Sequence, residues 1–223
     1  MRKIPEPEDL QMLRHRWARA IEIWVAYQTF LHREVLVGPD KICIDNLVVS
    51  QTTHTLLVAY YSFIYSLFDP SATHFERVTE KLMDSLPEEA KGVRKMILEH
   101  WKTIQEPISI IRSNIGFHGS PKSKGLKYGY GSFKSIHPWA SEYLMTLMRV
   151  FFRFVHEVFE SKEPMAIPPK RLDTLEILRM AKEMKAYIDA NPTEAIMEQW
   201  SDFFGRVSRG EIRLLAQNSD TRH

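Results

Sequence analysis

The chain has 223 residues, enough to bury a sizeable core as a single domain. Hydrophobic residues make up 44% of it and charged residues 26%, a balance typical of a soluble globular protein. The formal net charge is only +2, so the overall field argues neither for nor against nucleic acid, and any electrostatic argument must be local.

Cysteine content and hydropathy indicate the compartment. The single cysteine, Cys43, excludes an intrachain disulfide and favours a reducing cytoplasm. The first eight residues carry positive charge without an apolar run behind them, so we expect no signal peptide there. The most apolar run, residues 56–68, is too short and too rich in tyrosine and serine to cross a bilayer. We therefore expect a cytoplasmic protein with no membrane partner.

Helical periodicity runs through the first part of the chain. Apolar side chains recur at three- and four-residue steps over residues 8–37, which predicts a first helix. Asp45 or Asn46 can cap a second helix that runs to Phe68. Its second half is apolar almost all round, which is typical of a helix in the middle of a bundle or at a subunit interface. A shorter amphipathic helix is predicted over residues 74–85.

A longer helix is predicted from Pro87, because proline suits the first helical turn. Pro107 lies inside its pattern and predicts a kink or a break. Residues 119–135 contain repeated glycines, so no stable helix is expected there. The remaining predicted helices cover residues 138–161, 171–190 and 193–207. No strand pattern alternates convincingly, so we predict an all-α fold, an elaborated bundle formed as one domain over residues 1–223.

The segment between the long helix and the glycine-rich stretch carries groups suited to phosphate chemistry. It consists of Ile111, Arg112, Ser113, Asn114, Ile115, Gly116, Phe117 and His118. Arginine is a fixed, forked cation, and histidine carries protons near neutral pH. On an uninterrupted helix Arg112 and His118 would diverge, because six residues turn the chain by about 240°. They can share a site only if the helix ends between them, and Gly116 suits a helix C-terminus.

This segment resembles the R-x(4–6)-H motif of ribonucleases of the HEPN superfamily, with Arg112 and His118 as its two ends. The apolar second helix and the helix leading into Arg112 also resemble HEPN proteins of abortive-infection and toxin systems. The resemblance covers residues 10–160 as a HEPN-like core. A helical extension over residues 165–223 lies outside it.

The resemblance implies an endoribonuclease that needs neither a metal nor another cofactor, acting as a toxin or phage-defence effector. In such an enzyme the ribose 2′-hydroxyl attacks the adjacent phosphate, so RNA is cut and DNA is not. His118 would act as general base or acid, and Arg112 would stabilise the growing charge. Family members often carry Asn, Asp or His directly after the arginine. Here Ser113 and Asn114 follow, and either is a candidate to orient the substrate or the histidine.

The same resemblance implies a homodimer. One histidine cannot remove and donate a proton at the same moment, whereas a two-fold interface repeats every residue and brings two motifs together. RNA is the expected substrate, and an antitoxin protein is a further candidate partner.

Candidate RNA contacts follow the motif. They are Lys122, Lys124, Lys127, Tyr128 and Tyr130. Lysine suits a phosphate backbone, and tyrosine offers a stacking face for an unpaired base. A solvated connector explains the same composition equally well.

Other interpretations stay open. Arg112 can pair with a glutamate such as Glu106, and His118 can satisfy helix carbonyls and nothing more. A HEPN-like dimer can also lack catalysis and bind a nucleotide, nucleic acid or partner protein, or the motif can be accidental in a structural bundle. The histidines show no Glu-x-x-His or His-Glu-x-x-His spacing, so no metal site is predicted, and His54 and His137 cannot be placed.

Overall fold

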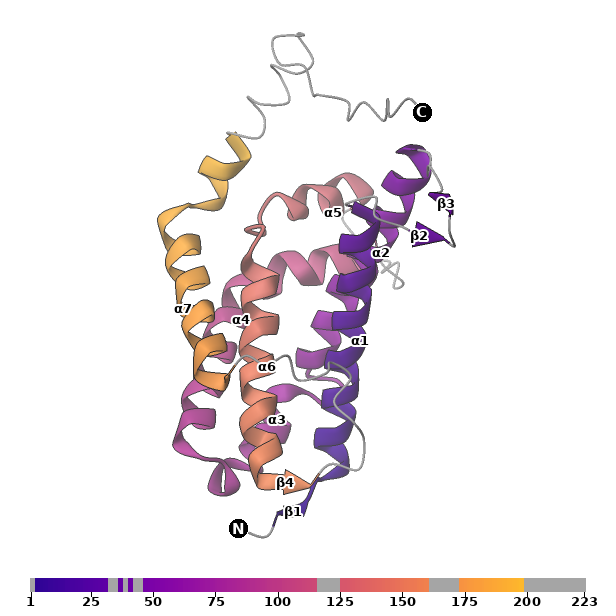
Figure 1. Cartoon of the computed structure of the whole chain (residues 1–223). Helices are drawn as coiled ribbons and strands as arrows, with labels where there is room; N and C mark the ends of the chain where they lie inside the picture. The colour runs from indigo at the N-terminus through magenta and orange to yellow at the C-terminus, as the bar shows by residue number, and fades with distance from the viewer. Residues whose placement is uncertain are drawn as a thin grey trace, which may run out of the picture.

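The computed structural model describes residues 3–31, 36–37, 40–41, 46–115, 125–160 and 173–198. This part of the chain is an all-α bundle, as predicted, in which α1, α2, α6 and α7 lie roughly along one long axis (Figure 1). The helices are α1 (Glu8–Leu31), α2 (Asn46–Phe68), α3 (Phe75–Glu80), α4 (Glu88–Asn114), α5 (Leu126–Phe133), α6 (Ala140–Val158) and α7 (Thr174–Ala190). A 3₁₀ turn covers Met83–Ser85, and residues 193–198 are also helical.

The structure contains two short strand pairs that the sequence did not predict. β1 (Ile4–Pro5) pairs in parallel with β4 (Phe159–Glu160), beside the end of α6. β2 (Leu36–Val37) pairs with β3 (Asp40–Lys41) in an antiparallel hairpin. Each strand has two residues, too few for a period-two alternation to be recognised. The predicted first helix is therefore shorter than expected and ends at Leu31.

The core lies where α1, α2, α4 and α6 meet. Its largest fully buried side chains include Trp17 from α1, Tyr60 from α2, and Phe151 and Phe152 from α6. Trp17 packs against Phe152 with ring centroids 5.0 Å apart. α2 packs against both α1 and α4, which fits the prediction that an apolar helix over residues 56–68 lies inside a bundle.

Helix α4 runs through Pro107 without interruption, so the predicted break does not occur. A proline inside a helix removes one backbone hydrogen bond and crowds the preceding turn. On either side of it α4 buries Ile104, Ile108 and Ile111 in the core. Burial of these side chains offsets that local cost, since each contributes about 1.5–3 kcal/mol.

Helix α5 contradicts the prediction that residues 119–135 hold no helix. It begins after Gly125, whose φ of 91° suits glycine, and it includes Gly129 and Gly131. A Cβ at Gly129 would lie 2.7 Å from Ile115 Cγ1 and 2.9 Å from the Asn114 Cβ. The glycine that weakens the helix locally therefore lets α5 approach the end of α4 closely.

These two glycines make a matched pair for mutation. Gly129→Ala should lower the free energy of unfolding by about 1–3 kcal/mol relative to Gly131→Ala, because its Cβ overpacks the contact with α4. A Cβ at Gly131 meets nothing within 4 Å, so that alanine should stabilise α5 by roughly 0.5–1 kcal/mol. Urea unfolding of both variants checks the difference. Equal midpoints would contradict the close packing of Gly129.

The other boundaries differ from the predictions by small shifts. The helix expected over residues 74–85 divides into α3 and the 3₁₀ turn. The helix expected from Pro138 begins at Ala140, after a turn, and ends at Val158. α7 ends at Ala190, directly before the Asn-Pro pair, as predicted. No helix in the described part of the chain is long and apolar enough to span a bilayer.

Candidate functional site

Helix α4 ends between the two halves of the motif. Its last residue is Asn114, and Ile115 closes it by donating its N–H to the Ile111 carbonyl at 2.9 Å. The helix therefore stops before Gly116, as a shared site for Arg112 and His118 requires. His118 itself, with Gly116, Lys122 and Lys124, lies outside the described residues.

Arg112 is held against the end of α2. Its Nη2 lies 3.3 Å from Asp69 Oδ2, and its guanidinium carbon lies 4.5 Å from the centre of the Tyr65 ring. Its side chain remains 25% exposed. An arginine has five N–H donors, so one contact with Asp69 leaves most of them able to meet an anion that approaches from solvent.

Asp69 is itself fixed by a turn. Its Oδ1 accepts hydrogen bonds from the Ser71 backbone N–H at 3.0 Å and from the Ser71 hydroxyl at 2.7 Å. Burial would raise the pKa of Asp69, but these hydrogen bonds and then the charges of Arg112 and Arg16 outweigh it, so the pKa is lowered. Asp69 is thus ionised at neutral pH and orients Arg112 as a fixed negative partner.

The ion pair corrects the interpretation that Arg112 pairs with Glu106. Glu106 lies six residues earlier on the same helix, so the two side chains point about 120° apart around its axis and about 9 Å apart along it. Asp69 reaches Arg112 from the turn that follows α2. Sequence spacing cannot reveal this pairing, because it depends on how α2 and α4 cross.

Asn114 and Ser113 occupy different environments. Asn114 Nδ2 donates to the Ile110 carbonyl at 2.8 Å, which turns the amide back onto α4. Its Oδ1 is buried and has no hydrogen-bond partner among the described residues. Ser113 is partly exposed. Asn114 therefore has one buried acceptor available for a donor that approaches the end of α4.

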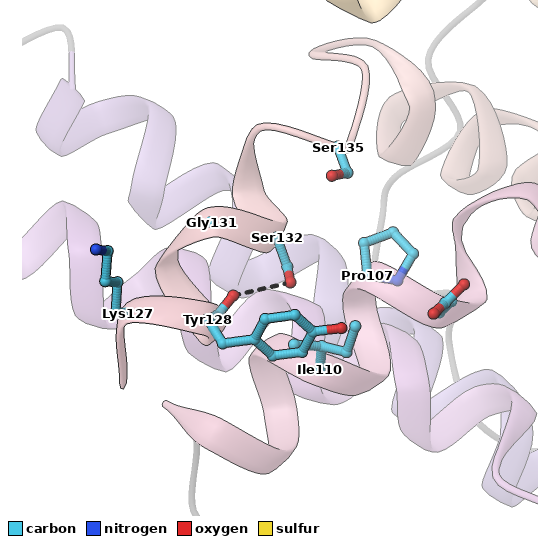
Figure 2. A pocket seen from close by; sticks show the side chains of 8 residues that line it. Pro107, Ile110, Lys127, Tyr128, Gly131, Ser132 and Ser135 are labelled. Atoms are coloured by element: carbon cyan, nitrogen blue, oxygen red, sulfur yellow. Dashed lines mark hydrogen bonds between the residues drawn. The ribbon is translucent and has the colours of Figure 1, made fainter. Parts of the chain in front are cut away.

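The described RNA-contact candidates all belong to α5. Lys127 and Tyr128 line a cavity of about 650 Å³ between α4 and α5, together with Ile110 and Glu106 (Figure 2). Ile110 and Arg112 are two residues apart on α4, so their side chains point about 160° apart around the helix axis. The structure thus brings Lys127 and Tyr128 together but places their cavity on a different face of α4 from Arg112.

Tyr130 and His54 form a pair that sequence reasoning could not place. The Tyr130 hydroxyl lies 3.2 Å from His54 Nε2, and the ring centroids are 5.3 Å apart. His54 belongs to α2 and Tyr130 to α5. Tyr130 is still 46% exposed, so its ring keeps a face toward solvent.

Sequence reasoning missed a carboxyl group with a perturbed pKa. Glu142, in the first turn of α6, accepts a hydrogen bond from the Ser141 hydroxyl at 2.9 Å. Burial raises the pKa of Glu142 to about 7, although the Ser141 bond opposes this. Burial and then the charge of Glu142 also raise the pKa of Tyr27, Tyr60 and Tyr61. Since acidic residues are common in a first helical turn, nothing in the sequence singles out Glu142.

The described histidines do not assemble a metal centre. His100 is buried, with Nε2 2.8 Å from the Ala140 carbonyl, and burial lowers its pKa. His137 accepts a hydrogen bond from the Trp139 N–H at 3.1 Å on Nδ1, and burial lowers its pKa as well. Across the described ranges, no group of three or more His, Cys, Asp or Glu side chains is placed to hold a metal ion.

The geometry thus offers an oriented arginine near a helix end, a buried amide oxygen where the same helix end meets α5, and a cavity between α4 and α5. Comparisons with protein-family models, with curated proteins and with solved structures found no match for this chain. The functional assignment therefore depends on the chemistry of these residues.

Proposed function

We propose that the protein is a metal-independent endoribonuclease with a HEPN-like fold, in which Arg112 binds the scissile phosphate and His118 transfers a proton. The observation that carries this proposal is the end of α4 at Asn114, directly after an arginine oriented by Asp69 and Tyr65. A helix that ends there meets the condition for Arg112 and His118 to share one site. An arginine fork matches the geometry of a phosphate group.

The reaction would proceed by attack of the ribose 2′-hydroxyl on the adjacent phosphorus. The 2′ oxygen forms a bond to phosphorus as the bond to the 5′ oxygen of the next nucleotide breaks. One histidine takes the 2′ proton, and a second protonates the leaving oxygen, while arginine stabilises the charge on the phosphoryl oxygens. A homodimer would supply both histidines, as two copies of His118. Its action as a toxin or phage-defence effector, restrained by an antitoxin, belongs to the same proposal.

The test is cleavage of mixed RNA by purified protein in the presence of EDTA, beside His118→Ala. Wild-type protein should cut RNA and spare DNA of the same sequence, and the variant should spare both. His15→Ala serves as a matched control, because His15 is an exposed residue of α1. Equal cleavage by wild type and His118→Ala, or none by either, would refute the proposal.

A second candidate function has one observation in its favour. The ion pair of Arg112 with Asp69 and its stacking on Tyr65 also suit an arginine that joins α2 to α4. In that case the protein is a non-catalytic helical dimer that binds a nucleotide, a nucleic acid or a partner protein. RNA binding without cleavage, unchanged by His118→Ala, would favour this function over the first.

A further inference from the structure

A cavity of about 650 Å³ lies between α4 and α5, apart from the face of α4 that carries Arg112. Its size falls in the range of small-molecule sites, roughly 300–1,000 Å³. Glu106 and Ile110 line it from α4, and Lys127, Tyr128 and Gly131 line it from α5 (Figure 2). The close approach of α5 at Gly129 fixes the two walls relative to each other.

The charged groups of this cavity have opposite sign. Within the described part of the chain, neither the Glu106 carboxylate nor the Lys127 ammonium is engaged in an ion pair. Glu106 belongs to α4, whereas Lys127 stands at the start of α5. Figure 2 shows Lys127 at one side of the cavity and the Tyr128 ring extending across it toward Pro107. A ligand would therefore need hydrogen-bond donors for Glu106 and negative charge for Lys127.

The wall of the cavity also offers an aromatic face. The Tyr128 side chain is 39% exposed and lies over Ile110. A planar ring can stack on such a face, and base–tyrosine stacking contributes about 1–3 kcal/mol for each base. The Ser132 hydroxyl already donates to the Tyr128 carbonyl at 3.1 Å, so it presents an acceptor to the cavity. A flat heterocycle joined to an anionic group fits this combination.

We propose that the cavity between α4 and α5 binds a guanine nucleotide. Ionised glutamate only accepts hydrogen bonds, and guanine is the RNA base whose pairing edge presents two adjacent donors, N1–H and the 2-amino group. Adenine, cytosine and uracil each place an acceptor beside a single donor there. Glu106 recognises the base edge, Tyr128 stacks on the base, and Lys127 binds the phosphate.

This site would add base recognition to the proposed ribonuclease. It rests on the proposed function in one respect: the bound nucleotide would then be part of an RNA strand. A guanine bound on one face of α4 would determine which phosphate of the strand reaches Arg112 on the other face of the helix. A free guanosine monophosphate presents the same groups. A guanosine in an RNA strand and free guanosine monophosphate would therefore be recognised by the same groups, and binding experiments distinguish these two ligands.

Calorimetric titration with nucleoside monophosphates provides the test. Wild-type protein should bind guanosine monophosphate more tightly than the adenosine, cytidine and uridine compounds. Inosine monophosphate, which lacks the 2-amino group, should bind roughly 10-fold more weakly than the guanosine compound. Glu106→Gln should weaken binding by roughly 10–100-fold, because the amide offers a donor where an acceptor is needed.

Gly131→Leu is the blocking variant. Gly131 lines the cavity and its Cβ would meet nothing within 4 Å, so we expect the added side chain to occupy the cavity. Gly92→Leu is the matched control, since Gly92 is an exposed residue of α4 with equally open surroundings. The first variant should abolish binding and the second should leave it unchanged. Equal affinity for guanosine and adenosine compounds, or binding that survives both Glu106→Gln and Gly131→Leu, would overturn the proposal.

The RNA arm uses His118→Ala protein, so that no strand is cut, with oligouridine containing one guanosine or none. Tighter binding of the guanosine strand than of free guanosine monophosphate identifies a strand subsite, and equal affinity identifies a free-nucleotide site. Both results support guanine recognition, and no preference in either arm refutes it. Cleavage by wild type without guanine binding would reject this inference alone. Guanine binding without cleavage would reject the ribonuclease alone.

Discussion

Replacement of Arg112 by alanine is expected to slow RNA cleavage by about 10²–10³-fold, the usual loss when one preorganised donor to a transition-state oxyanion is removed. The fold should survive, since a partly exposed pair such as Arg112–Asp69 contributes only about 1 kcal/mol. Arg112→Lys keeps the charge but loses the fork and the planar contact with Tyr65. It should recover part of the rate. Single-turnover cleavage, measured beside urea unfolding, separates chemistry from stability.

Asp69→Asn distinguishes a catalytic arginine from a purely structural one. The amide oxygen can still accept from Ser71, but the negative charge beside Arg112 is gone. The guanidinium should then attract phosphate more strongly, so the KM for RNA should fall. If Arg112→Ala and Asp69→Asn destabilise the protein equally and neither alters cleavage, the pair only joins α2 to α4.

Replacement of Glu142 by glutamine is expected to stabilise the protein above pH 7 by on the order of 2–3 kcal/mol. The folded-state pKa of Glu142 is raised from 4.5 to about 7, so the folded protein binds this proton more tightly than the unfolded chain does. Between about pH 4.5 and 7 its contribution to stability therefore falls as pH rises, and above pH 7 the penalty stays constant. Glutamine has nearly the same shape and carries no charge at any pH.

The measurement is the free energy of unfolding from pH 5 to 8.5 for both proteins. The difference between them should be smallest at pH 5, rise with pH, and approach its full value by pH 8. His100 and His137 act in the opposite sense over part of this range, because burial lowers their pKa. Their effect is common to both proteins and cancels in the difference. A difference that does not vary with pH would contradict the raised pKa of Glu142.

Helical periodicity predicted most of the bundle. α2 begins at Asn46 and ends at Phe68, and α7 ends at Ala190, where the sequence placed these boundaries. α5 was missed because its glycines disfavour a helix in isolation. Its stability comes from contact with the end of α4, where Gly129 leaves room for Asn114 and Ile115. Local propensity contains no information about such a contact.

The candidate site, too, was predicted in part from the sequence. Sequence spacing required that a helix end between Arg112 and His118, and α4 does end there. The placement of His118, Lys122 and Lys124 stays a prediction, as do the dimer and the RNA substrate. Spacing alone could not identify Asp69 and Tyr65 as the partners of Arg112, nor the pairing of His54 with Tyr130. It also could not show that Lys127 and Tyr128 line a cavity on another face of α4.

The sequence by itself determined most of the helices, although not α5, which of their faces are apolar, and that Arg112 stands near the end of a long helix. These properties follow from the spacing of side chains along one segment, where each residue turns the chain by about 100°. Only the tertiary structure decided which carboxylate faces Arg112, which carboxyl group is half-buried near enough to tyrosines to raise their pKa, and where a cavity opens. Those properties depend on how separate helices cross, and crossing depends on side-chain packing between segments that are distant in the sequence.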